Sequence, residues 1–177
     1  MIQVAAALLF PEDVSKAIDE LRLRFGTPVV RAVVPHITLI YPFTPKTSID
    51  VMHEGLEPVG QRHAPFTVLL NGFRYFEGEN TVAYLAVEDA GPILTLHRSV
   101  ADALSDIAEG RLAHFENEHF VPHVTIHDGV PKERLPSLKA ELNAVDFRRE
   151  ARMDSFALFA NDGTGWCIVG TVHLTGE

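Results

Sequence analysis

Cysteine is nearly absent from this chain, since Cys167 is the single one in 177 residues. One thiol cannot form an internal disulfide or complete a cysteine metal site, which excludes a disulfide scaffold and fits a reducing compartment. Long apolar runs are missing as well, because none approaches the roughly 20 residues that span a bilayer. The apolar start, residues 1–10, lacks a basic segment and soon meets Pro11, so it does not make a convincing signal peptide. We therefore expect a cytoplasmic protein with no membrane partner.

Positive charge is scarce, with 15 Lys and Arg against 24 Asp and Glu and a net charge of −9. A surface that tracks long nucleic acid needs clustered cations, so this balance argues against one. The interval from Leu21 to Ile49 is the exception, because it holds no acidic residue and carries Arg22, Arg24, Arg31 and Lys46. A small anion could bind there, and ordinary variation of charge between helices and loops is the alternative explanation.

One short pattern occurs twice in the sequence. It reads Pro-His-Ile-Thr-Leu at residues 35–39 and Pro-His-Val-Thr-Ile at residues 122–126. Side chains alternate between the two faces of a strand, so His36 and Thr38 are predicted to share one face while their apolar neighbours enter a core. The same holds for His123 and Thr125. Two copies could face each other across a cleft and form a catalytic constellation.

The repetition carries more weight than either copy alone. A single His-x-Thr arises easily by chance in a chain with nine histidines, whereas two copies that each follow an apolar residue and Pro are a much stronger signal. The alternative is a pair of strand histidines satisfied by local hydrogen bonds.

The order of the expected elements also repeats. The first half predicts a strand at 2–10, a helix at 13–26, a loop or short strand from 27, the motif strand at 36–41 ended by Pro42 and Pro45, a helix at 48–59 and a hairpin of 66–76 with 81–87. The second half predicts that the strand at 81–87 also matches the first strand of the chain, followed by a helix at 92–110, the motif strand at 122–127, a helix at 132–143 and a hairpin of 151–159 with 166–174. This order predicts an internal duplication with halves of about 1–80 and 81–177.

The duplication sets the expected fold class. Two units that each bury a helical face on a small sheet give an α+β protein of two lobes, with mixed or antiparallel sheets and a central cleft. We expect one bilobal domain over residues 1–177, because no Ser/Gly-rich linker divides the halves. A pseudo-twofold packing would bring the motif strands together.

Paired His-x-Thr strands in a duplicated β-α-β frame resemble the two-histidine (2H) phosphoesterase superfamily, which includes 2′-5′ RNA ligase-like proteins and cyclic nucleotide phosphodiesterases. The resemblance covers nearly the whole chain, and all four motif positions match. It implies that His36 and His123 act on a phosphate while Thr38 and Thr125 hold its oxygens. It also implies hydrolysis of a 2′,3′-cyclic phosphate or a related phosphodiester of a nucleotide or short RNA end.

The chemistry of phosphodiester hydrolysis also fits these residue types, without reference to the family. Opening a cyclic phosphodiester requires a base that activates water and an acid that protonates the departing oxygen, and two imidazoles can fill both roles near neutrality. Threonine hydroxyls can donate to the developing charge. We therefore expect no metal and no other cofactor. Which histidine is the base stays open.

Further contacts to the substrate are predicted around the motifs. Tyr41, Phe43 and Phe120 flank them and could stack on a base, although aromatic residues near strand ends more often belong to a core. Arg31, in the acid-free interval, is a candidate for binding the phosphate.

The second motif departs from the family pattern in one respect. Many relatives of the RNA-ligase type follow it with an Arg, whereas this chain has His127 and Asp128. His127 is predicted to share the face of His123 and Thr125, so it could act as a substitute donor. An ordinary surface or core histidine is the alternative.

Two other functions compete with this hypothesis. A metal site would use His114, His119 and His123, but Pro122 interrupts any helix that would place the last two on one face. A noncatalytic protein that binds nucleotides or RNA on the same scaffold is the stronger rival, because a fold does not determine a function. No protein partner is inferred, and we expect a monomer.

Overall fold

Two four-stranded antiparallel sheets organise the computed structural model, which describes residues 2–107 and 120–177. The first sheet has the order β2-β1-β7-β8 and consists of β1 (Gln3–Leu9), β2 (His36–Phe43), β7 (Ser155–Asn161) and β8 (Trp166–His173). The second has the order β5-β4-β3-β6 and consists of β3 (Phe66–Phe76), β4 (Thr81–Glu88), β5 (His123–Val130) and β6 (Arg148–Met153). The strand pairs within both sheets are antiparallel. The predicted α+β class is confirmed.

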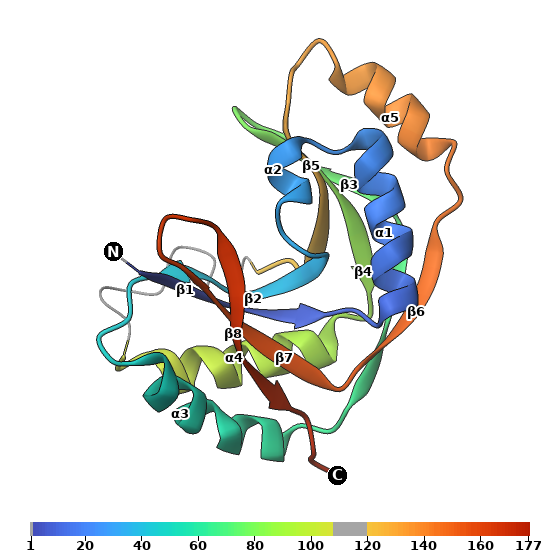
Figure 1. The fold of residues 1–177 in the computed structure, drawn as a ribbon. Helices are drawn as coiled ribbons and strands as arrows, with labels where there is room; N and C mark the ends of the chain where they lie inside the picture. The colour runs from blue at the N-terminus through green and yellow to red at the C-terminus, as the bar shows by residue number, and fades with distance from the viewer. Residues whose placement is uncertain (1, 108–119) are drawn as a thin grey trace.

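Helices cover one face of each sheet (Figure 1). They are α1 (Glu12–Phe25), α2 (Pro28–Arg31), α3 (Ile49–Arg62), α4 (Gly91–Leu104) and α5 (Leu135–Asn143). Helices α3 and α4 pack against each other and against β8 and β2 of the first sheet, while α1 contacts β5 and β6 and α5 contacts β3 of the second. The longer helices each bury apolar residues on one face, such as Val14, Ile18 and Phe25 of α1, which removes apolar surface from water.

The two halves of the sequence exchange elements. Strand β3, from the first half, pairs with β4 and joins the second sheet, while β7 and β8, from the second half, extend the first sheet. Helix α1 likewise crosses to the second sheet. As a result, the motif strands β2 and β5 are the outer strands of their sheets, and they contact each other. This arrangement brings the two His-x-Thr segments together, as the repetition predicts.

The prediction of one strand over residues 151–159 is wrong. The chain leaves the second sheet after Met153, passes Asp154 and enters the first sheet at Ser155, so two strands replace one. The alternation of buried and exposed residues runs up to the crossing, with Ala151 and Met153 buried and Arg152 and Asp154 exposed, and residues 156–160 after it are all buried. Because Asp154 alone separates the two strands, the sequence contains no loop that would mark the change of sheet.

The predicted loop or short strand from residue 27 is also wrong, because it forms the short helix α2. Thr27 caps this helix by accepting a hydrogen bond from the backbone N–H of Val30 at 3.4 Å, and Pro28 occupies the first turn, where its missing N–H costs nothing. Pro42 does not end β2, which continues to Phe43. As an outer strand, β2 can contain a residue that donates no ladder hydrogen bond.

Smaller differences concern helix ends. Helix α1 begins at Glu12 after Pro11, without a side-chain cap from Asp13, and α5 begins at Leu135 instead of 132. The end predicted for the helix at 92–110 falls on residues 108–110, outside the described residues. In the part of the chain that the structure describes, none of the helices combines the length and apolar character that crossing a membrane requires.

Candidate functional site

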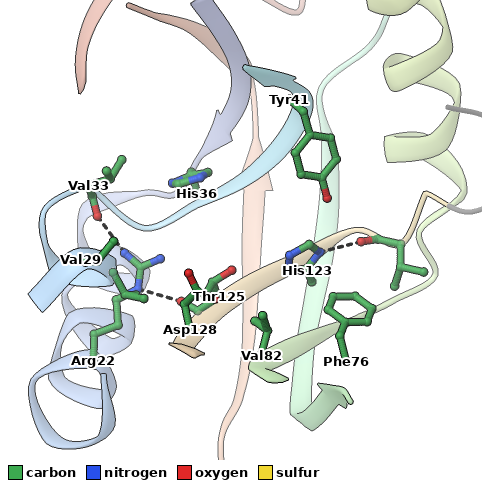
Figure 2. A pocket seen from close by; sticks show the side chains of 12 residues that line it. Arg22, Val29, Val33, His36, Tyr41, Phe76, Val82, His123, Thr125 and Asp128 are labelled. Carbon is green, nitrogen blue, oxygen red and sulfur yellow. Dashed lines mark hydrogen bonds between the residues drawn. The ribbon is translucent and has the colours of Figure 1, made fainter. Parts of the chain in front are cut away.

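A cavity of about 530 Å³ opens between the two motif strands (Figure 2). Side chains reach it from α1, α2, β2, β3, β4 and β5, so both sheets contribute to its walls. His36 and Tyr41 enter it from β2, and His123 and Thr125 enter it from β5. Apolar walls come from valines such as Val29 and Val82, which leaves the polar groups few and concentrated. A concave, mostly apolar site with a few convergent polar groups is the usual form of a small-ligand site.

The two histidines are held in the same way. The Nδ1 atom of His36 lies 2.7 Å from the carbonyl oxygen of Val34, and Nδ1 of His123 lies 2.7 Å from that of Val121. A carbonyl oxygen only accepts, so each Nδ1 carries the proton and donates. In the neutral ring, Nε2 is then the atom with a free lone pair. Both imidazoles are therefore set in the tautomer that can act through Nε2.

Burial lowers the pKa of both histidines from the ordinary value. For His36, burial is the main cause, the hydrogen bond to Val34 opposes it, and the charges of Arg22 and His123 lower the pKa further. For His123, burial also dominates, and the hydrogen bond to Val121 opposes it. The cleft therefore favours neutral rings until something negative enters it. His123 is among the charges that lower the pKa of His36, in keeping with the position of both residues on one cavity.

The surroundings of the two histidines differ. The ring of His123 contacts Phe76 edge-on at 4.9 Å between centroids and Tyr84 at 5.2 Å, and these two aromatic rings stack on each other at 4.2 Å. Among the described residues, His36 has one such contact, with Phe159 at 5.9 Å. The two sites are related by the repeat but are unequal in their packing.

The strand register explains this inequality. Thr125 on β5 pairs with the bulky Tyr84, whereas Thr38 on β2 pairs with the small Ala7. Beside Thr38, the space that an alanine leaves open forms a second cavity of about 130 Å³, which shares His36 with the main one. Phe159 and Trp166 line this second cavity, and their place there had no signal in the local sequence. Thr38 belongs to the smaller cavity, and Thr125 to the larger.

Among the described residues, Arg22 on α1 is the Lys or Arg side chain that lines the main cavity. Its side chain is 1% exposed, yet it lines the cavity, with Nε donating to the carbonyl of Thr125 at 3.0 Å and Nη1 donating to that of Val33 at 2.9 Å (Figure 2). Burial lowers its pKa to about 10, and Asp19 opposes this effect. The sequence does contain a signal for this position, because Arg22 lies four residues after the buried Ile18 and falls on the apolar stripe of the helix.

Of the three aromatic residues predicted to contact the substrate, one lines the main cavity and two belong to the core. Tyr41 lines the main cavity, and burial raises the pKa of its hydroxyl. Phe43 and Phe120 are 7% exposed and belong to the hydrophobic core, where Phe120 stacks on His97 at 4.0 Å. Neither is among the described residues that line either cavity, so the structure puts them in the core alternative.

His127 and Arg31 also lie apart from the cavity walls that the described residues form. The Nδ1 atom of His127 donates to the carbonyl of Phe25 at the end of α1, which fits the alternative of a structural histidine. Arg31 is exposed at the end of α2. Asp128 does line the main cavity, and its carboxylate accepts a hydrogen bond from the Nδ2 atom of Asn80 at 2.9 Å.

The competing metal site can be examined only in part. Within residues 2–107 and 120–177, no group of three His, Cys, Asp or Glu side chains is arranged to hold a metal ion. His114 and His119 lie outside the described residues.

Comparison with known proteins agrees with this architecture. The family profile of the 2′-5′ RNA ligase superfamily matches residues 10–165. A Bacillus cereus (strain G9842) protein with the provisional name phosphoesterase is 32% identical over 175 residues, which cover 94% of each chain. A Bacillus cytotoxicus protein of the same provisional name is 28% identical over 173 residues, again with 94% of each chain covered.

Solved structures share the fold. The crystal structure of TT0787 from Thermus thermophilus aligns with a TM-score of 0.71 at 22% identity and covers 99% of both chains. Escherichia coli LigT complexed with 3′-AMP aligns with a TM-score of 0.64 at 17% identity and covers 98% of both chains. Since the profile spans most of the chain and the fold agrees, the protein belongs to the 2′-5′ RNA ligase superfamily of two-histidine phosphoesterases.

Proposed function

We propose that the protein is a metal-independent phosphoesterase that opens a 2′,3′-cyclic phosphate, or a related phosphodiester, of a nucleotide or short RNA end. One observation carries the proposal, namely the matched hydrogen bonds from Nδ1 of His36 and His123 to backbone carbonyls. They leave two Nε2 atoms available on one cavity, which is what a reaction with one proton removed and one proton delivered requires.

The reaction divides between the two imidazoles. A neutral histidine removes a proton from the attacking water at Nε2 while the water oxygen bonds to phosphorus. The bond from phosphorus to the ribose oxygen breaks, and the protonated histidine gives its Nε2 proton to that oxygen. The product is a phosphate monoester with one free ribose hydroxyl. Because the rings exchange protonation states, a proton must return to the acid and leave the base before the next turnover.

The threonines complete the chemistry on the phosphate. We infer that the hydroxyls of Thr38 and Thr125 donate to non-bridging phosphate oxygens, on which negative charge is concentrated as water attacks. Each sits on the same face of its strand as the neighbouring histidine, since residues two apart share a face. Since Thr38 lines the smaller cavity and His36 lines both, the proposal requires the phosphate to lie beside His36, where the two cavities meet.

We propose that the nucleoside part of the substrate occupies the rest of the main cavity. Of the three predicted aromatic contacts, Tyr41 is the one that lines the main cavity, so it is our candidate for stacking on a base. The presence of 3′-AMP in a LigT complex supports a nucleotide as the class of ligand, because the two proteins share a fold. The net charge of −9 favours a small ligand over an extended polyanion.

A noncatalytic protein that binds nucleotides is the alternative function, and product analysis separates the two. Purified protein is incubated with each 2′,3′-cyclic nucleotide and with oligonucleotides ending in a cyclic phosphate, and the products are identified by ³¹P NMR. The proposal expects a phosphate monoester from at least one class of substrate. Tight binding without turnover of any of them would favour the noncatalytic alternative.

A further inference from the structure

Arg22 is out of place by the usual rules of burial. It lies among the buried residues of α1 and is 1% exposed. Arginine is rarely fully buried without a partner of opposite charge. Among the described residues, no carboxylate forms a salt bridge with it. Its observed hydrogen bonds go to the carbonyl oxygens of Thr125 and Val33, which carry no net charge. A buried cation without an ion-pair partner is costly, and the charge of Asp19 only partly offsets the effect of burial on the Arg22 pKa, so this burial calls for a reason.

The guanidinium of Arg22 has N–H donors that form no hydrogen bond to a described residue. It carries five N–H groups in a planar fork, and the two hydrogen bonds to Thr125 and Val33 use Nε and one hydrogen of Nη1. Nη2 and the second hydrogen of Nη1 donate to no other described residue. Figure 2 shows the guanidinium between Val33 and Thr125 at the wall of the cavity. A planar fork of unused donors matches the geometry of phosphate oxygens.

The position of Arg22 favours an anion bound between the two motif histidines. Arg22 shares the main cavity with His36 and His123 and binds the backbone of Thr125 directly. Its charge also acts on His36, whose pKa it lowers. Asp128 is the acidic side chain among the described residues of the same cavity, and it is engaged by Asn80. An anion placed between the histidines would therefore meet a cation whose charge no described carboxylate pairs with.

We propose that Arg22 is a phosphate-binding residue, whose unused Nη hydrogens donate to a non-bridging oxygen of the phosphate held between His36 and His123. This inference rests on the proposed function, because it requires that a phosphate group enters the cavity. Arg22 supplies the counter-charge from a helix, outside both repeated motifs. The phosphate in turn supplies the ion-pair partner that the buried guanidinium lacks among the described residues.

A purely structural role is the alternative that the test must separate. By bonding to Val33 before β2 and to Thr125 on β5, Arg22 links the two motif strands, and its removal would leave two buried carbonyls unpaired. Loss of stability alone therefore does not distinguish the two roles. The affinity of the folded protein for inorganic phosphate does distinguish them.

The experiment measures inorganic phosphate binding by isothermal titration calorimetry for the wild type, Arg22→Met and Arg22→Lys, with urea unfolding to confirm that each is folded. Arg24→Met is the matched control, because Arg24 lies on the same helix, is exposed and changes the net charge equally. We expect Arg22→Met to weaken phosphate binding on the order of tenfold to a hundredfold, as the loss of a charged hydrogen-bond donor does. Arg22→Lys should lose less, and Arg24→Met should bind like the wild type.

Unchanged phosphate affinity in a folded Arg22→Met protein would overturn the inference and leave the proposed function intact. No phosphate binding to the wild type would contradict the phosphate site itself, and the proposed function would fail with it. If Arg22→Met does not fold, the wild type still decides the matter through the ¹⁵N signal of the Arg22 Nε–H group, assigned by its absence in Arg22→Lys. A shift of that signal as phosphate saturates the protein supports the inference, and an unmoved signal overturns it.

Discussion

His36 and His123 face one cavity from the outer strands of two different sheets, and each donates from Nδ1 to the carbonyl of the valine two residues earlier. In both cases a proline stands between the valine and the histidine. Proline fixes its own φ and restricts the residue before it, so the carbonyl is presented to the ring by a stiff segment. The repeated Pro-His pair therefore does two things, because it begins the motif strand and sets the tautomer of the histidine.

The lowered pKa values of His36 and His123 predict the pH dependence. Activity through kcat/KM needs one neutral and one protonated ring in the free enzyme, so the profile is a bell bounded by two pKa values that both lie below 6.5. Its maximum is therefore expected below pH 6.5. A bound phosphate raises the pKa of both rings, so the kcat profile should lie at higher pH than the kcat/KM profile.

Steady-state kinetics from about pH 4 to about pH 9 check this prediction. Among the described residues, the charged and titratable groups around the histidines are Arg22, Tyr41 and Asp128 on the cavity walls and Tyr84, whose ring contacts that of His123. A kcat/KM maximum well above neutrality would contradict the account, and so would a single-sided profile over the whole range.

Substitution of the motif threonines should slow the reaction without abolishing it. Thr38→Val and Thr125→Val keep the shape of the side chain and remove one hydroxyl donor each. We expect each to lower kcat by roughly tenfold to a hundredfold, as the loss of a hydrogen bond to a charged group does. Both should be milder than loss of a histidine. Thr175→Val is the matched control, because Thr175 lies in the exposed third His-x-Thr sequence near the end of the chain.

Chelation should leave the activity unchanged, because the positioned imidazole and hydroxyl donors supply the acid, the base and the charge stabilisation. Turnover is measured before and after dialysis against EDTA and after adding back Zn²⁺, Mg²⁺ or Mn²⁺. Complete loss with EDTA and recovery with one metal would replace the two-histidine mechanism with the metal alternative.

The preferred ligand should be small. A footprint of one or two phosphates predicts that log affinity falls with log salt with a slope of about −1, since each phosphate of a single strand contributes roughly −0.7. Binding of a cyclic mononucleotide is compared with that of an RNA of about 20 nucleotides across a salt series, where a groove binder would show a slope several times steeper. Much tighter and steeply salt-dependent binding of the long RNA would contradict the small-ligand prediction.

The motif strands could be predicted from sequence because their pattern is local. Alternation assigned Ile37 and Leu39 to a core, and both are 0% exposed, as are Val124 and Ile126 of the second copy. Repetition of the element order then predicted two sheets and a cleft between them. These inferences need only the period of a strand and the observation that the order occurs twice.

The rest of the site depends on contacts between distant segments. Arg22 donates a hydrogen bond to Thr125, which lies 103 residues later in the sequence. Trp166 lines the cavity of Thr38 only because β7 and β8 join the first sheet. The position of Arg22 on an apolar stripe signals burial but does not identify a cavity. Arg31 was the arginine predicted at the phosphate, yet one turn of α2 leaves it exposed. Whether it binds substrate stays a prediction.

The central claim is that His36 and His123 act as one acid–base pair. It is tested by measuring kcat for hydrolysis of 2′,3′-cyclic AMP, or of whichever cyclic phosphate the wild type opens fastest, in His36→Ala, His123→Ala and the double variant. His173→Ala is the matched control, because His173 is the exposed histidine of the third His-x-Thr sequence. Circular dichroism and urea unfolding establish that every variant is folded.

The account predicts that each single substitution lowers kcat on the order of 10²- to 10⁴-fold, that the double variant falls far less than the product of the two losses, and that His173→Ala keeps full activity. Two groups that serve one proton relay lose their joint function when either is removed. Full turnover by a folded His36→Ala or His123→Ala protein would contradict the account.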